Sequence, residues 1–222
     1  TGKKLTKIMS TSNTGLADTL ITHFDRALRT LVPGSVTAAR QNPATAARNN
    51  QLDARDSKQS AGLMRINHTG EVCAQALYQG QSLTARLPEV RLSMEQAAAE
   101  EIDHLHWCEA RLEELDSQPS IFNPLWYGMS YGLGALAGLA GDKWSLGFVA
   151  ETEHQVCEHL NEHLHRLPET DSKSKAILEQ MLIDEAKHAT MAETAGAADL
   201  PRACKKSMRF MAGLMKQIVY RI

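Results

Sequence analysis

The strongest constraint on the fold of this chain is a pattern of glutamate and histidine that occurs twice. In each copy a single Glu is followed, 30 residues later in one copy and 32 in the other, by the motif Glu-x-x-His. The first copy consists of Glu71, Glu101 and His104, and the second consists of Glu153, Glu185 and His188. Residues three apart share one face of an α-helix. The pattern therefore predicts two helical hairpins, each with its polar side chains directed to one side.

The neighbours of these glutamates on the expected helix faces are mostly apolar. Around Glu101, for example, they are Ala97, Ala98, Leu105 and Cys108. A buried carboxylate is costly unless it is paired or bound to a cation, so four carboxylates in one core require positive charge. Two divalent ions would balance them. One Glu from each of two helices, with Glu-x-x-His from each of two others, is the ligand set of four-helix bundles that hold two iron or two manganese ions.

The expected ligands combine carboxylates with imidazoles. Zinc prefers fewer oxygen ligands, whereas iron and manganese accept this mixture, and iron supplies two redox-active centres. We predict two iron ions per chain, bound by Glu71, Glu101, His104, Glu153, Glu185 and His188. Asp184 and Glu100 lie next to ligands and are candidates to orient the ligand histidine of the opposite half. The sequence shows no nucleotide or flavin motif, and we predict no catalytic side chain beyond the metal ligands.

Composition favours an all-helical domain. The chain has 222 residues, enough for a substantial core, and only 5% of them are aromatic. The formal net charge of −2 argues against general binding of nucleic acid. Four cysteines without a C-x-x-C motif predict free thiols in a reducing compartment. The basic N-terminus lacks the apolar segment of a signal peptide, and Met9 is a candidate natural start.

We divide the chain into an N-terminal helix and linker, residues 1–59, and a metal-binding domain, residues 60–222. The spacing of apolar residues predicts an amphipathic helix over 14–32 and a loop over 35–57. A basic amphipathic helix is expected over 201–220. The four core helices are expected at 60–86, at 89–115, after Asp142 to before Pro168, and at 171–195.

The segment 121–141 contains no charged residue and is long enough to cross a bilayer. Its five glycines lower its apolar density, and Asp142 ends it. Three interpretations therefore remain open: a helix in the membrane interface, a buried helix packed through small residues, and a membrane span. Trp126 and Tyr127 suit an interface. The basic C-terminal helix is either a second membrane-surface element or a packed helix with a solvated basic face.

Several motifs resemble one known family, the 3-demethoxyubiquinol hydroxylases. Asn67–Glu71 followed by Ala76–Gln81 is similar to the first ligand helix of that family. The two Glu-x-x-His motifs occur in the family order, and between them lie an Asn-Pro-Leu-Trp stretch, Asn123–Trp126, and a Val-Ala-Glu-type helix, Val149–Glu153. The resemblance covers the chain from Ser60 to its C-terminus, and the order, the spacing and the apolar insert all agree.

The resemblance implies an all-α, ferritin-like four-helix bundle with an extra N-terminal helix, an apolar helical insert and a C-terminal helix. It implies a di-iron monooxygenase of ubiquinone biosynthesis that hydroxylates the ring of a polyprenyl demethoxyquinol with O2. The six ligands above match the family motifs, with Glu101 and Glu185 as bridging carboxylates. The family binds membranes peripherally, which places this chain on the cytoplasmic face of a bacterial inner membrane.

The resemblance does not decide the electron donor, the protein partners or the alternative functions. The two electrons for the reaction come from a reductase or through the quinone itself, and other ubiquinone-biosynthesis proteins or a second copy of the chain are candidate partners. The alternatives are a membrane-associated di-iron quinol oxidase, a ferroxidase, and a helical scaffold with its carboxylates in ion pairs. A soluble iron store does not need the apolar segment 121–141, which favours the hydroxylase.

Overall fold

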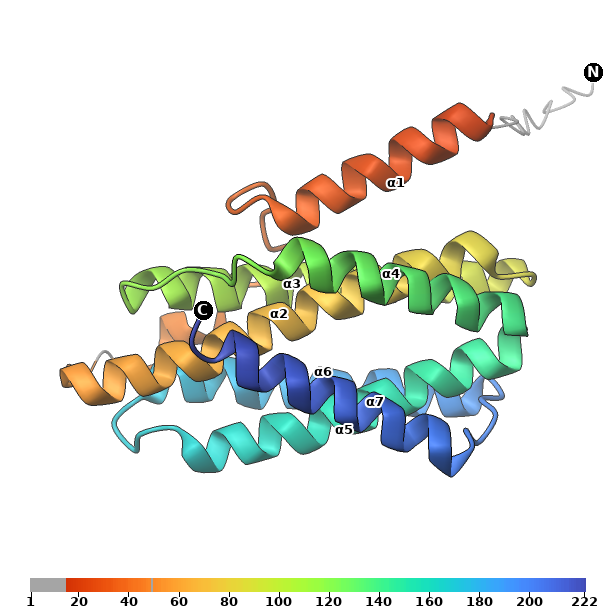
Figure 1. The fold of residues 1–222 in the computed structure, drawn as a ribbon. Helices are drawn as coiled ribbons and strands as arrows, with labels where there is room; N and C mark the ends of the chain where they lie inside the picture. Colours follow the sequence, from red (N-terminus) through yellow and green to blue (C-terminus); the bar gives the residue numbers. More distant parts are fainter. Residues whose placement is uncertain (1–14, 49) are drawn as a thin grey trace, which may run out of the picture.

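The computed structural model describes residues 15–48 and 50–222, and this part of the chain is helical and contains no strand. Met9 lies outside the described residues. The elements, shown in Figure 1, are α1 (Leu16–Leu31), the 3-10 helix η1 (Pro43–Ala46), α2 (Ala54–Thr84), α3 (Pro88–Glu114), α4 (Asn123–Ala140), α5 (Asp142–Arg166), α6 (Ser172–Thr194) and α7 (Arg202–Val219).

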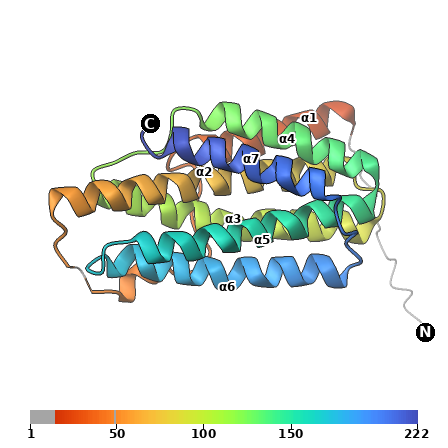
Figure 2. The same ribbon diagram turned by 60° about the horizontal axis from the view of Figure 1, so that its bottom comes forward.

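Four of these helices, α2, α3, α5 and α6, form the bundle that the sequence predicts. Short turns join α2 to α3 and α5 to α6, so each pair is an antiparallel hairpin. The helices α4 and α7 pack on α2 and cover one side of the bundle, as Figure 2 shows, and α1 lies over the same region. The chain thus adds three helices, α1, α4 and α7, to a four-helix core within the described residues.

The predicted helix boundaries hold to within a few residues, except at the start of α2. This helix begins at Ala54 instead of about Ser60, because the side chain of Asp53 accepts hydrogen bonds from the backbone N–H groups of Arg55 and Asp56 at 2.9 and 2.8 Å. The expected loop over 35–57 therefore contains η1 and the first turn of α2. The division into 1–59 and 60–222 stays a prediction, although its boundary falls inside a helix.

The apolar segment 121–141 forms α4, which is neither buried all round nor fully exposed. Gly80 of α2 and Gly134 of α4 let the two backbones approach closely, since a Cβ atom at either position would collide with the main chain of the other helix. The opposite side of α4 exposes Leu125, Leu136 and Leu139. None of the described helices combines the length and the apolar content that crossing a membrane requires.

The apolar core consists mainly of two clusters that lie on either side of the predicted ligands. One contains Leu63, Trp107 and Met181, and the other contains Tyr78, Val149 and further residues of α2, α3 and α5. Along α2, α3 and α6, the predicted ligands fall between the residues of the first cluster and those of the second. The four cysteines have free thiols, as predicted. The bundle therefore places a polar layer between two apolar layers.

Candidate metal centre

All six predicted ligands lie together in the middle of the bundle. Each is at most 3% exposed, and each of the four bundle helices supplies at least one. Their potential ligand atoms form two groups of four, and the atoms within a group lie within 4.8 Å of one another. The groups are Glu71, Glu101, His104 and Glu185, and Glu101, Glu153, Glu185 and His188. The structure thus brings every predicted site residue to one place, while their role as metal ligands stays a prediction.

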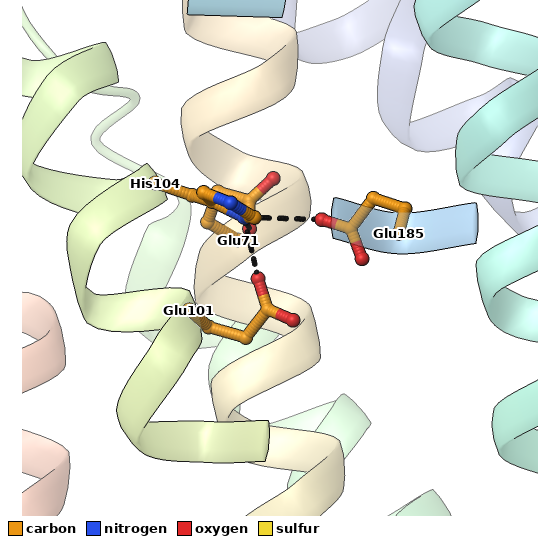
Figure 3. Close-up of side chains that lie close together, drawn as sticks. All are labelled: Glu71, Glu101, His104 and Glu185. Carbon is orange, nitrogen blue, oxygen red and sulfur yellow. Dashed lines mark hydrogen bonds and ion pairs between the residues drawn. The ribbon is translucent and has the colours of Figure 1, made fainter. Parts of the chain in front are cut away.

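The first group surrounds the ring nitrogen Nδ1 of His104, as Figure 3 shows. This atom lies 2.9 Å from Oε2 of Glu101 and 3.1 Å from Oε1 of Glu185. Oε2 of Glu71 lies 3.7 Å away and forms no hydrogen bond with any described residue. A buried carboxylate oxygen without a partner is costly, so this oxygen marks a place where a cation fits.

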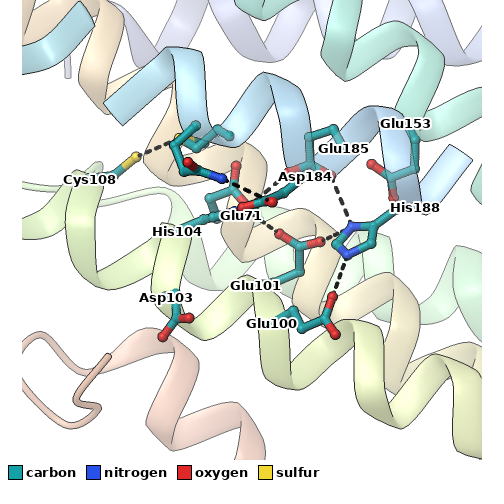
Figure 4. Close-up of polar contacts among 12 residues, drawn as sticks. Glu71, Glu100, Glu101, Asp103, His104, Cys108, Glu153, Asp184, Glu185 and His188 are labelled. Atoms are coloured by element: carbon teal, nitrogen blue, oxygen red, sulfur yellow. Dashed lines mark hydrogen bonds and ion pairs between the residues drawn. The ribbon is translucent and has the colours of Figure 1, made fainter. Parts of the chain in front are cut away.

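The second group repeats this arrangement around Nδ1 of His188 (Figure 4). This nitrogen lies 3.0 Å from Oε1 of Glu101 and 3.3 Å from Oε2 of Glu185. Glu101 and Glu185 therefore present one oxygen to each histidine, which is the arrangement expected of carboxylates that bridge two metal ions. Glu153 completes the group and accepts a hydrogen bond from the hydroxyl of the buried Tyr78.

The outer nitrogen of each histidine is held by an acidic residue of the opposite half, as predicted. Nε2 of His104 lies 3.2 Å from Oδ2 of Asp184, and Nε2 of His188 lies 2.8 Å from Oε2 of Glu100. A proton on Nε2 donated to these carboxylates leaves the lone pair of Nδ1 free for a metal ion. Asp184 and Glu100 therefore orient both rings and favour the tautomer that a bound metal ion requires.

Arg40 is a site residue that the sequence did not reveal. Its guanidinium reaches Asp103 at 2.6 Å and Asp184 at 2.7 Å, and it stacks over the ring of Trp107 with 4.9 Å between the guanidinium carbon and the ring centroid. The segment 35–57 was expected to be a loop, and no spacing or periodicity sets Arg40 apart from the other arginines there. Only the folded chain places it beside His104.

The electrostatics of the cluster fit a site for cations. Burial raises the pKa of Glu71 and the pKa of Glu153 well above the usual value of a glutamate. Burial acts in the same direction on Glu101, but charged His104 and His188 outweigh it and lower the pKa of Glu101. Burial disfavours charge on His188, yet hydrogen bonds to Glu101 and Glu185 raise its pKa to about 12. Protons alone thus balance these charges unless metal ions replace them.

Two further histidines are buried beside the cluster. His163 is fully buried, and its Nδ1 lies 2.8 Å from the amide oxygen of Asn67. It follows Leu160 by three residues, so it shares the buried face of α5. His68 is also buried, and its Nδ1 lies 3.3 Å from the amide nitrogen of Asn123. Each of the two histidines thus contacts a side-chain amide of another helix.

An apolar pocket lies next to the cluster, between α2, α4, α5 and α7. It encloses about 870 Å³ of empty space, part of it open to solvent. Apolar side chains such as Trp126, Phe148 and Met211 make up most of its lining. Ala74 and Thr152 line both this pocket and a small neighbouring cavity that touches Glu153. The pocket therefore approaches the second group of ligands from the side of α4 and α7.

Comparisons with known proteins show the family of this chain. The family model described as "Ubiquinone biosynthesis protein COQ7" matches residues 58–218. The chain is 59% identical to a 3-demethoxyubiquinol 3-hydroxylase of Pseudomonas putida (strain GB-1) and 60% identical to one of Azotobacter vinelandii, in each case over 92% of the chain and 95% of the relative. A third, of Acinetobacter baylyi, is 58% identical over 92% of the chain and 97% of the relative.

A solved structure confirms the fold class. The bacterioferritin-related protein of Bacteroides fragilis, a dodecameric thioferritin, superposes with a TM-score of 0.53 over 62% of this chain and 84% of its own, at 17% sequence identity. At this identity the likeness concerns the fold alone. The all-α, ferritin-like bundle is therefore as predicted, and a buried cluster of glutamate and histidine in such a fold indicates a di-iron site.

Proposed function

Because this chain belongs to the family of the ubiquinone biosynthesis protein COQ7, we propose that it is a monooxygenase that hydroxylates the ring of a polyprenyl demethoxyubiquinol. One oxygen atom of O2 enters the ring, and the other leaves as water after taking up two electrons and two protons. The observation that carries this proposal is the pair of overlapping Glu and His groups beside an apolar pocket. The pocket suits a long apolar substrate, and the groups suit two metal ions.

The donor set fits two iron ions per chain. Glu101 and Glu185 would bridge them, Glu71 and Glu153 would each bind one, and so would the two histidines, His104 and His188. When bound, a pair of irons supplies the redox chemistry that activates O2. Four carboxylates then meet a charge of +4, which accounts for their burial without a surplus of negative charge.

The protein residues orient the ligands and exclude water. Asp184 and Glu100 hold the outer nitrogens of the two histidines, and Tyr78 donates a hydrogen bond to Glu153. The two apolar clusters on either side keep bulk water from the centre. We propose that the chain's part in the reaction is to orient the ligands, and that the apolar pocket directs the ring of the substrate.

The pocket supports entry of the quinol from the side of α4 and α7. A polyprenyl tail is apolar, and the lining that Met129, Leu133 and Met215 contribute matches it. The head group would then reach the ligands past Ala74 and Thr152, close to Glu153. Trp126 lines the same pocket, which gives the segment 121–141 a second role besides membrane contact.

The same side of the molecule supports peripheral binding to a membrane. Leu125, Leu136 and Leu139 of α4 and Phe210 of α7 are exposed, and Arg209 and Lys206 lie near Phe210 in the sequence. Apolar side chains with basic neighbours are typical of helices at a membrane surface. The cytoplasmic face of a bacterial inner membrane is our proposed location, with a reductase, other ubiquinone-biosynthesis proteins or a second copy of the chain as candidate partners.

The decisive experiment follows the oxygen atom. Purified, iron-loaded protein is given a reduced demethoxyubiquinol and ¹⁸O2, and the products are analysed by mass spectrometry. One labelled atom on the ring supports the hydroxylase. Labelled water without a ring product would indicate a quinol oxidase, and oxidation of added Fe²⁺ alone would indicate a ferroxidase; either result would contradict the proposal. In cells lacking the protein, demethoxyubiquinone should accumulate.

A further inference from the structure

Arg40 joins the N-terminal segment to the metal centre, although it lies outside the residues 58–218 that match the family model. Its Nε lies 2.6 Å from Oδ2 of Asp103 on α3, and its Nη1 lies 2.7 Å from Oδ2 of Asp184 on α6. Both aspartates are buried. The backbone N–H of Ala39 also donates to Asp103, at 2.6 Å. One guanidinium thus bridges two helices that carry ligands.

The bridge continues to His104 through one oxygen of Asp184, and Nη2 of Arg40 itself lies 3.4 Å from Nε2 of His104. Oδ2 of Asp184, which accepts from Arg40, is also the atom 3.2 Å from Nε2 of His104. The guanidinium fixes the position of this oxygen, and the oxygen in turn fixes the orientation of the His104 ring. Nδ1 of His104 then faces Glu101 and Glu185, at 2.9 and 3.1 Å from their nearest oxygens.

The corresponding contact of His188 has a different environment. Its outer nitrogen meets Glu100, whose side chain is 41% exposed and accepts a further hydrogen bond from Gln96 at 3.0 Å. Among the described residues, no Lys or Arg forms an ion pair with Glu100. The two halves of the site therefore have the same ligands but different support: a buried, arginine-bound carboxylate on one side and a partly exposed one on the other.

We propose that Arg40 is a positioning residue for the metal position that His104 holds, so that the two metal positions differ in affinity. This inference rests on the proposed di-iron site. Asp184 keeps its contacts to Gln180 and Lys187 through its other oxygen. Loss of Arg40 therefore weakens one position without removing a ligand from either.

The test is a titration of the full, metal-stripped chain with Mn²⁺, in which the EPR signal of free Mn²⁺ reports binding. The wild type should bind two ions. Arg40→Gln should weaken one of the two binding steps by about tenfold and leave the other within about twofold, since residues that support a ligand typically change metal affinity by roughly 10–100-fold. Arg48→Gln, an exposed arginine on the same segment, is the matched control and should match the wild type.

Two further variants separate positioning from a merely structural role. Glu100→Gln should weaken one step as well, and the double variant with Arg40→Gln should weaken both, because the two changes act on different metal positions. In ⁵⁷Fe-loaded protein, each single variant should alter a different Mössbauer doublet. Arg40→Lys keeps the positive charge but replaces the planar guanidinium, which can bind two carboxylates, with a compact ammonium. Its loss of Mn²⁺ affinity should be intermediate and should affect the same binding step as Arg40→Gln.

Three results would overturn the inference. The first is that Arg40→Gln binds both ions as the wild type does, the second is that both binding steps weaken equally, and the third is that Arg40→Gln weakens the same step as Glu100→Gln. Each would show that Arg40 only attaches the segment to the bundle. Circular dichroism of every variant identifies misfolding, in which case Arg40→Lys decides the question. If the wild type itself fails to bind two ions, the proposed di-iron function fails, and the inference fails with it.

Discussion

The centre of the bundle and the outer side of α4 invert the usual distribution of polar and apolar groups. Glu101 in the centre is 0% exposed, whereas Leu136 on the surface of α4 is 64% exposed. Globular proteins usually bury leucine and expose glutamate. The buried carboxylates favour a cation inside, as the donor set indicates, and the exposed leucines of α4 form the surface that we propose a lipid membrane covers. The same physical argument, burial against exposure, thus motivates both proposals.

The largest effect is expected when a predicted metal ligand is removed from the centre of the bundle. Glu185→Ala removes a carboxylate that faces both histidines, so it should release most of the iron. We expect hydroxylation to fall by more than the roughly 10–100-fold typical of residues that only support a ligand. Iron content by metal analysis and product by mass spectrometry measure the two effects. The exposed Glu179→Ala on the same helix should change neither, and a fully active Glu185→Ala would contradict the site.

A second prediction concerns stability. Metal ions that bind the folded chain and not the unfolded one should stabilise it by about 2.7 kcal/mol when their free concentration is a hundred times the dissociation constant. Urea unfolding of the metal-free protein with and without Mn²⁺ measures this difference. Glu185→Ala should show little of it. If Mn²⁺ left the wild-type unfolding midpoint unchanged, the buried carboxylates would have to be balanced by protons alone.

The sequence predicted the interior better than the exterior, for a physical reason. Helical spacing fixes which side chains share a face, so the clustering of all six candidate ligands, as well as the Asp184 and Glu100 contacts, follows from positions along the chain. The ligand-bearing helices were placed to within a few residues, apart from the early start of α2. Their identification required no knowledge of how distant segments pack.

Features that depend on long-range packing were not predictable. Arg40 reaches α6 from a polar segment with no periodicity, and its partner Asp184 is 144 residues away. The close packing of α4 on α2 depends on glycines such as Gly80 and Gly134, which approach the other helix only in the folded chain. The sequence alone left three interpretations of segment 121–141 open, and the structure shows a helix that is buried on one side and exposed on the other.

A third prediction concerns the exposed apolar side of α4. Leu136→Asp replaces an exposed leucine of α4 with a charge, and should weaken binding to anionic liposomes by about 2 kcal/mol, because the leucine no longer enters the apolar layer. Sedimentation with vesicles measures it. Leu92→Asp on α3, a leucine that is also 64% exposed, is the matched control and should bind as the wild type does. If both variants lost liposome affinity equally, α4 would not be the helix that contacts the membrane.

The same variant sharpens the comparison between the two regions. Leu136→Asp changes no ligand, so its iron content should equal that of the wild type. Turnover of a long-chain quinol presented in vesicles should fall much more than turnover of a short-chain soluble analogue, since only the former must be taken from the membrane. Similar losses for both substrates would mean that this side of α4 is merely structural.

The smallest expected effect tests a buried histidine that is not one of the predicted metal ligands. Burial lowers the pKa of His163 from the usual value to about 3, and Asn67 satisfies its Nδ1. Between these two pKa values the unfolded chain binds the proton and the folded chain does not, so stability should fall as the pH falls through this window. One histidine contributes about 1.4 kcal/mol per pH unit.

His163→Gln should therefore lessen the loss of unfolding free energy between pH 6.5 and pH 5.5 by about 1 kcal/mol, measured by urea unfolding of metal-free protein. His165→Gln, at an exposed position on the same helix, should leave the slope of the unfolding free energy against pH as in the wild type. If His163→Gln also left this slope unchanged, His163 would have to be charged already in the folded chain.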